Sequence, residues 1–177
     1  MTLITMGLAG CSAQQVPATL NYGVVTSGDL DFMKNGVVTY SWHPKSEQIY
    51  LSQKYDKTVI TDLVRDAIQE QLSNKGYQFN QDHGDVVVGF GLAQNSEFND
   101  DAIFDAINLS TGVEFYASEG KQAEKGSLYI AFFVPNSDTR LWQALAQSDI
   151  QPKLSPSETK QRIKGYVGRL FSGMPER

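Results

Sequence analysis

One cysteine, Cys11, is the only thiol among the 177 residues of this chain. The residues after it can therefore form no internal disulfide, no zinc site with cysteine ligands and no cysteine nucleophile. Residues 20–177 must fold by burying apolar surface, and a chain of that length is long enough to build a core without covalent cross-links. The composition agrees, because 41% of the residues are hydrophobic and 20% are charged, as in an ordinary globular domain. We expect a single domain.

Cys11 also ends a run of small and apolar residues that is typical of a lipobox, the cleavage signal of bacterial lipoproteins. Ala9 and Gly10 supply small side chains beside the cleavage site, and Leu8 supplies the branched apolar one. We expect the Cys11 sulfur to carry diacylglycerol and its new amino group to be acylated, for example with palmitate. Two or three acyl chains give a stable membrane anchor where one gives only a marginal one.

The lipobox divides the chain into three parts. Residues 1–10 are expected to be the remnant of a signal peptide, residues 11–19 the lipidated cysteine and its tether, and residues 20–177 the folded domain. A complete signal has a basic start and about 7–15 apolar residues. Residues 1–10 contain no Lys or Arg, so we expect the signal to begin upstream of Met1. Ser12 follows the cysteine, where aspartate commonly marks inner-membrane retention. The sequence therefore favours the periplasmic face of a Gram-negative outer membrane.

Hydrophobic periodicity predicts the elements of the domain. Strand patterns cover residues 20–26, 37–42, 85–92, 113–117, 127–134 and 140–147. Helical spacing covers residues 59–72, 98–109 and 156–171, and the last helix opens with a capping box and a proline at its first position. In the second helix we expect Ile103, Phe104 and Ile107 to face inward. This order predicts an α+β fold, with a mainly antiparallel sheet packed against two or three helices.

Charge and motif content exclude several functions. The net charge of −5 provides no basic footprint for nucleic acid. Residues 89–91 (Gly-Phe-Gly) lack the helix-opening glycine pattern and lysine of a phosphate loop. The acidic residues Glu97, Asp100, Asp101 and Asp105 lack the spacing of a calcium loop and are expected to offset a helix dipole. We expect neither a metal nor a cofactor.

The two histidines suggest an alternative function. His83, between Asp82 and Asp85, has no second histidine at ligand spacing and is expected to lie in a polar turn. His43 is expected to end a strand. The alternative interpretation is a small periplasmic hydrolase that uses His83 or His43 with nearby carboxylates.

Aromatic residues are frequent on the predicted strands and are expected to fill the core. A sharper hypothesis is that Trp42 or Trp142 is exposed on one sheet face, where it forms a docking surface for an envelope protein or a glycan.

Several short segments, in order and spacing, resemble the bacterial lipoprotein family called domain of unknown function 4136. They are Asp31 with Phe32, residues 39–42 with Pro44, residues 75–77, residues 85–88, Leu141 with Trp142, and a last helix that closes near Pro175. The resemblance covers residues 21–175 and implies a lipid-anchored, exported protein with no assigned reaction. We therefore expect a non-enzymatic envelope lipoprotein that binds or supports an envelope component.

Overall fold

The computed structural model describes residues 22–116, 120–151 and 153–177. The predicted signal remnant, the lipobox residues Leu8, Ala9 and Gly10, the lipidation site Cys11 and the tether all lie outside the described residues. Within the described part, no helix has both the length and the apolar character needed to cross a membrane.

One mixed sheet forms the centre of the domain. Its strands in the described residues are β1 (Tyr22–Gly28), β2 (Thr39–Trp42), β3 (Gln48–Tyr50), β4 (Gln78–Phe79), β5 (Val86–Gln94), β6 (Lys125–Phe133) and β7 (Arg140–Asp149). They lie in the order β1-β7-β6-β5-β2-β4, and β3 pairs with β5 beside β2. The pairs among β1, β7, β6 and β5 are antiparallel, whereas β2 and β3 run parallel to β5, and β4 runs parallel to β2. The predicted α+β class is confirmed, with a mixed sheet.

Each α-helix begins directly after a residue whose side chain caps it. They are α1 (Lys57–Asn74), α2 (Asp100–Ile107) and α3 (Pro156–Leu170), and a turn of 3-10 helix spans Asp31–Lys34. Asp56 caps α1 by accepting a hydrogen bond from the Val59 amide, and Ser155 with Glu158 forms the predicted capping box of α3. These side chains satisfy amides that have no partner within the helix.

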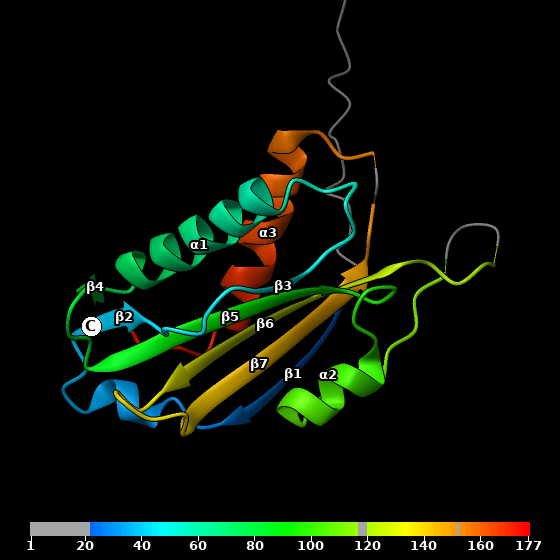
Figure 1. Cartoon of the computed structure of the whole chain (residues 1–177). Coiled ribbons are helices and arrows are strands. Elements are labelled where there is room, and N and C mark those ends of the chain that lie inside the picture. Colours follow the sequence, from blue (N-terminus) through cyan, green and yellow to red (C-terminus); the bar gives the residue numbers. More distant parts are fainter. Residues whose placement is uncertain (1–21, 117–119, 152) are drawn as a thin grey trace, which may run out of the picture.

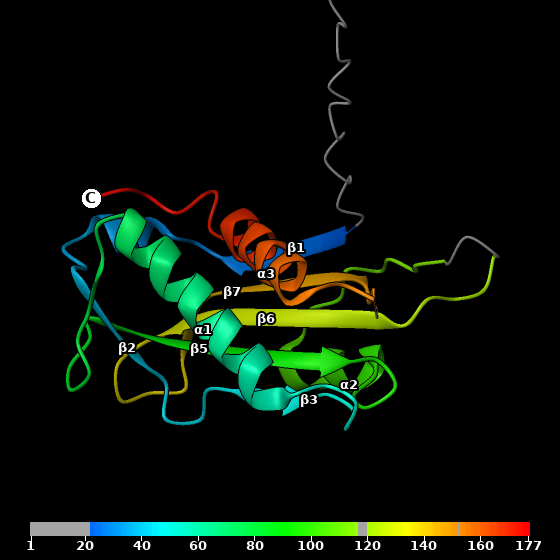
Figure 2. The same cartoon turned by 90° about the horizontal axis from the view of Figure 1, so that it is seen from above.

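Helices α1 and α3 both cover one face of the sheet, which we call the helical face (Figures 1 and 2). Because side chains alternate along a strand, every second residue of β5, β6 and β7 points to it. These residues form the main core with α1 and α3, and they are Val86, Val88, Phe90, Leu128, Ile130, Phe132, Trp142, Ala144 and Ala146. The core is closed from the helix side by residues such as Ile68, Val167 and Phe171, each fully buried.

The opposite side, which we call the open face, is covered only in part, by α2 (Figure 1). Two small clusters replace the large core there. Ile103 of α2 packs with Ala93, Leu109 and Leu145 in one cluster, and Val87, Ala131 and Phe133 form the other. The candidate site lies on the strand surface between these two clusters.

Two local predictions are wrong. Residues 113–116 form no strand, and Tyr116 makes an isolated bridge with Gln122. The Val113 carbonyl instead accepts a hydrogen bond from the Lys125 ammonium at 3.0 Å. Phe104 was expected to face inward, but it is 49% exposed. The eight-residue helix α2 turns a narrow face to the sheet, and Ile103 occupies it.

Candidate functional site

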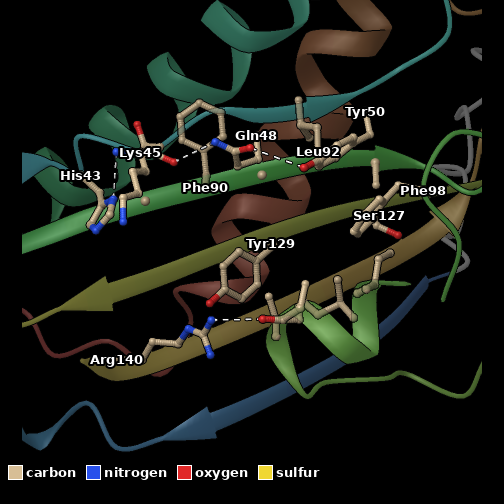
Figure 3. A pocket seen from close by; sticks show the side chains of 18 of the residues that line it. His43, Lys45, Gln48, Tyr50, Phe90, Leu92, Phe98, Ser127, Tyr129 and Arg140 are labelled. Carbon is tan, nitrogen blue, oxygen red and sulfur yellow. Dashed lines mark hydrogen bonds between the residues drawn. The ribbon is translucent and has the colours of Figure 1, made fainter. Parts of the chain in front are cut away.

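A cavity of about 360 Å³ lies on the open face, between α2 and the edge formed by β2 and β3 (Figure 3). We call it the open-face cavity. Strands β5 and β6 form its floor, α2 forms one wall, and the chain from His43 to Tyr50 forms the other. Segments distant in the sequence therefore meet around one hollow.

Two glycines of β5 leave space above the floor of the cavity. Gly89 and Gly91 are two residues apart on β5, so both lack a side chain on the same face. A Cβ atom at Gly89 would stand 3.1 Å from the Phe133 ring, and one at Gly91 would stand 3.3 Å from the Gln48 carbonyl oxygen. Glycine within a strand is typical of such a close approach. The glycines let the wall from His43 to Gln48 lie close against β5.

Aromatic rings close one end of the cavity. Tyr50 of β3 and Phe98, just before α2, stack with their ring centroids 4.3 Å apart and their planes at 15°. Ile103 and Leu145 lie beside them on the lining. In Figure 3 Tyr50, Phe98 and Ser127 gather at this end. The end is apolar and ring-lined.

Tyr129 lies on the floor between the two ends (Figure 3). Its hydroxyl donates a hydrogen bond of 2.9 Å to Gln143 Oε1 on the neighbouring strand. Burial raises the pKa of Tyr129 to about 12, so the ring is neutral at physiological pH.

Charged side chains gather at the other end. His43, Lys45 and Arg140 lie there in Figure 3, and Asp138 joins them on the lining. Asp138 is 3.3 Å from Lys45 Nζ and 3.4 Å from His43 Nε2. The ammonium of Lys45, and to a smaller extent His43, holds the pKa of the Asp138 carboxyl below its usual value. We call this end the cationic end.

Helix α2 is held over the sheet by polar contacts at both of its ends. At its start, Asp100 pairs with the Lys125 ammonium and accepts a hydrogen bond of 2.8 Å from Gln147 Nε2. At its end, the Ile107 carbonyl accepts from Gln143 Nε2 at 3.1 Å, and the Ala106 carbonyl accepts from Arg140 at 3.2 Å. The two bonds at the end of α2 satisfy backbone carbonyls that have no partner within the helix. The wall of the cavity is therefore fixed by side chains of β6 and β7.

The structure separates the two histidines of the alternative interpretation. His83 is exposed on the loop before β5, and His43 follows β2, so they lie at opposite ends of β2. His43 Nδ1 accepts a hydrogen bond from the Lys45 amide at 3.1 Å, and its ring packs on Phe133. Among the described residues no serine or threonine hydroxyl is hydrogen-bonded to His43. Nothing in this arrangement supports a hydrolase.

Trp142 does not form the predicted docking surface. It is 4% exposed and packs between Phe132 and Phe171 in the main core. Trp42 is half-buried on the same helical face, against Tyr40 and Phe90. The alternation in β2 and β7 places Trp42 and Trp142 on the side of the sheet that α1 and α3 cover. In the described part of the chain, no three residues among His, Cys, Asp and Glu are grouped so that they could hold a metal.

A second cavity, also about 360 Å³, lies on the helical face near the starts of α1 and α3. Tyr55 and Tyr166 line it, and within the described structure neither hydroxyl has a hydrogen-bond partner. We call it the helical-face cavity. Its charged lining consists of Lys54, Arg162 and Asp149, and Arg162 pairs with Asp149 at 2.9 Å.

Comparisons with known proteins agree on the family and the fold. The sequence profile described as domain of unknown function (DUF4136) matches residues 24–176. The PelC dodecamer of Paraburkholderia phytofirmans is a similar solved structure, with 8% identity, a TM-score of 0.51, and coverage of 89% of this chain and 99% of that one.

A DUF4136 family protein of Bacteroides thetaiotaomicron is 11% identical, with a TM-score of 0.51 and coverage of 89% of this chain and 99% of that one. A PDZ domain protein of Parabacteroides distasonis is 11% identical, with a TM-score of 0.50, and is covered over 35% of its length by 88% of this chain. At these identities the likeness shows the fold alone. Curated proteins gave no match to this chain.

Proposed function

This chain belongs to the DUF4136 family of domains of unknown function, and for it we propose a role in ligand binding rather than catalysis. The observation that carries the proposal is the open-face cavity. Its volume of about 360 Å³ falls within the range of small-molecule sites, about 300–1,000 Å³. An apolar interior with few polar groups at one end is also typical of such sites.

The cavity is built from parts that the rest of the fold holds in place. Its floor is the paired centre of the sheet, and α2 is tied down at both ends by Lys125 and Gln143. A preformed site binds more tightly, because less ordering is needed when the ligand arrives. This favours a domain that holds a small molecule.

We place this binding domain in the cell envelope as a lipoprotein. The support is the sequence Leu8, Ala9, Gly10 and Cys11, with a fatty-acylated Cys11 as the anchor. The serine at position 12 favours the periplasmic face of the outer membrane. In this role the domain presents its cavity to the periplasm, where it binds an envelope component or supports envelope assembly.

The binding proposal is tested with the neutral dye N-phenyl-1-naphthylamine, whose fluorescence rises in apolar surroundings. We expect the wild-type protein to bind it and Ala106→Trp to lose that binding. Ala106 is an exposed position of α2 on the cavity lining, so the indole fills the hollow without disturbing the core. The matched control is Thr159→Trp, which fills the helical-face cavity and should leave dye binding unchanged. Equal binding by wild type and Ala106→Trp would contradict the proposal.

The anchor is tested in cells that express the protein from its own chromosomal locus. With an alkyne-tagged palmitate, we expect the wild type to be labelled and to fractionate with the outer membrane. Cys11→Ser should lose the label and leave the outer-membrane fraction. A Cys11→Ser protein that keeps both label and membrane association would reject the anchor.

A further inference from the structure

We infer that the open-face cavity binds an amphipathic anion, with its apolar body over Gly91 and Tyr129 and one carboxylate, sulfonate or phosphate group at the cationic end. This inference rests on the proposed binding function and adds the chemical class of the ligand. It follows from the uneven distribution of charge and of rings along the cavity.

The charge at the cationic end is opposite to that of the chain as a whole. The chain carries a net charge of −5, yet the charged lining consists of Lys45 and Arg140 with one carboxylate, Asp138, beside His43. Two cations and one carboxylate leave an excess of one positive charge when His43 is neutral. An anionic group placed there is attracted, and Asp138 is already paired with Lys45.

Arg140 has the geometry to receive such a group. Its guanidinium is tied to the end of α2 by a hydrogen bond of 3.2 Å to the Ala106 carbonyl. A guanidinium has five N–H donors in a planar fork, and this bond is the one side-chain contact that Arg140 makes among the hydrogen bonds and ion pairs of the described residues. The remaining donors suit a carboxylate or phosphate, which Arg commonly binds in a bidentate manner.

The rest of the cavity requires an uncharged body. Tyr50 and Phe98 are stacked at the far end, Tyr129 is neutral on the floor, and Asp138 is the only acidic residue on the described lining. A second charge at the ring-lined end would lose its hydration without gaining a partner. The ligand therefore has one charged end, and the cavity volume of about 360 Å³ limits it to a small molecule.

Two dyes with the same ring system test this selectivity. N-phenyl-1-naphthylamine is neutral, and 8-anilinonaphthalene-1-sulfonate adds one sulfonate. We expect Lys45→Gln to weaken binding of the sulfonate dye about three- to fivefold, because Lys45 is largely exposed and solvent screens its charge. Arg140→Gln should weaken it about tenfold, as expected for a charge-assisted hydrogen bond. Asp138→Asn should strengthen it. Each of these variants should change the affinity for the sulfonate dye by a larger factor than the affinity for the neutral dye.

The matched control is Lys160→Gln, which removes the same charge from an exposed position of α3 on the helical face. It should change neither dye. Circular dichroism confirms that each variant is folded. If the lysine and arginine variants bind the sulfonate dye as the wild type does, or lose both dyes equally, the inference is overturned while cavity binding stands. If Ala106→Trp binds both dyes unchanged, the proposed function itself fails.

Discussion

The two faces of the sheet differ in how they are covered, although the same strands supply both. On the helical face, Phe132, Trp142 and Phe171 are in mutual ring contact and are almost completely buried. On the open face, β5 presents Gly89 and Gly91, and α2 covers only part of the surface. One face is filled by large side chains, whereas the other leaves a hollow. The difference shows how one sheet can combine a stable core with a binding site.

The means of attachment differ as well. Helices α1 and α3 are fixed by apolar packing along their length. Helix α2 has a single fully packed contact at Ile103 and relies on polar partners at both ends, including Lys125 and Gln143. Hydrogen bonds contribute modestly to stability when made, but they fix geometry. The open face is thus ordered by specific contacts more than by buried area.

The largest effect should come from two neighbouring phenylalanines on opposite faces. Phe132→Ala removes a fully buried ring from the main core and should lower the free energy of unfolding by about 3–5 kcal/mol. Phe133→Ala removes a ring from the small cluster with Val87 and Ala131. Phe133→Ala should lower the free energy of unfolding by about half as much as Phe132→Ala, because fewer atoms surround the Phe133 ring and water can enter the space. Urea denaturation of both variants gives the comparison, and equal losses would show that the two faces are equally packed.

The next effect concerns how α2 is held. Lys125 is 4% exposed and pairs with Asp100, so Lys125→Met leaves that carboxylate without its cation, although Gln147 still donates to it. Breaking a fully buried pair costs about 3–5 kcal/mol, and Asp100 is partly exposed, so we expect a loss of about 1–3 kcal/mol. Hydrogen exchange should accelerate more in α2 than in α1.

The control for this prediction is Lys164→Met on α3, which breaks the partly exposed pair with Glu70. An exposed pair contributes about 0–1 kcal/mol, so this variant should remain close to the wild type. Uniform acceleration of exchange across all three helices of Lys125→Met would mean that α2 is not an independently fixed element.

The sequence predicted the helical face well because its signals are local. The spacing of Val64, Ile68 and Leu72 identified α1, and the capping box at Ser155 placed the start of α3 within a residue. Strands β5, β6 and β7 are long enough for their alternation to be read. Strands β3 and β4 span three and two residues, too few to show any period, and they were not predicted.

The open-face cavity was not predicted, because it depends on contacts between distant segments. His43 and Arg140 are far apart in the sequence and meet only through the pairing of β2, β5, β6 and β7. One signal was present: two glycines two residues apart in an apolar strand, at Gly89 and Gly91, leave one face of that strand bare. The Trp142 hypothesis failed for a related reason. Alternation shows which residues share a face, but not which face the helices will cover.

The smallest effect concerns two tyrosines, one on each face. Burial raises the pKa of both Tyr40, on the helical face, and Tyr129, on the open face, to about 12 from 10.0. A raised folded-state pKa means that each neutral phenol stabilises the folded state fully below about pH 10. That contribution is lost as the pH rises from about 10 towards 12, because the unfolded chain ionises first. Stability should therefore fall over this range.

Single substitutions separate the two contributions. Tyr129→Phe removes the hydrogen bond to Gln143 and should lower the free energy of unfolding at pH 7 by about 0.5–1.5 kcal/mol. Tyr40→Phe should lower it less, because no hydrogen bond of the Tyr40 hydroxyl is present in the described structure. Urea denaturation at pH 8 to 12 should show a shallower alkaline fall for each variant than for the wild type. Of these two tyrosines only Tyr129 faces the open-face cavity, so ultraviolet titration with the bound neutral dye should show one fewer upward-shifted phenol in Tyr129→Phe than in the wild type or Tyr40→Phe. The same dye-dependent shift in Tyr129→Phe as in the wild type would place the dye away from Tyr129 and remove the functional difference between the faces.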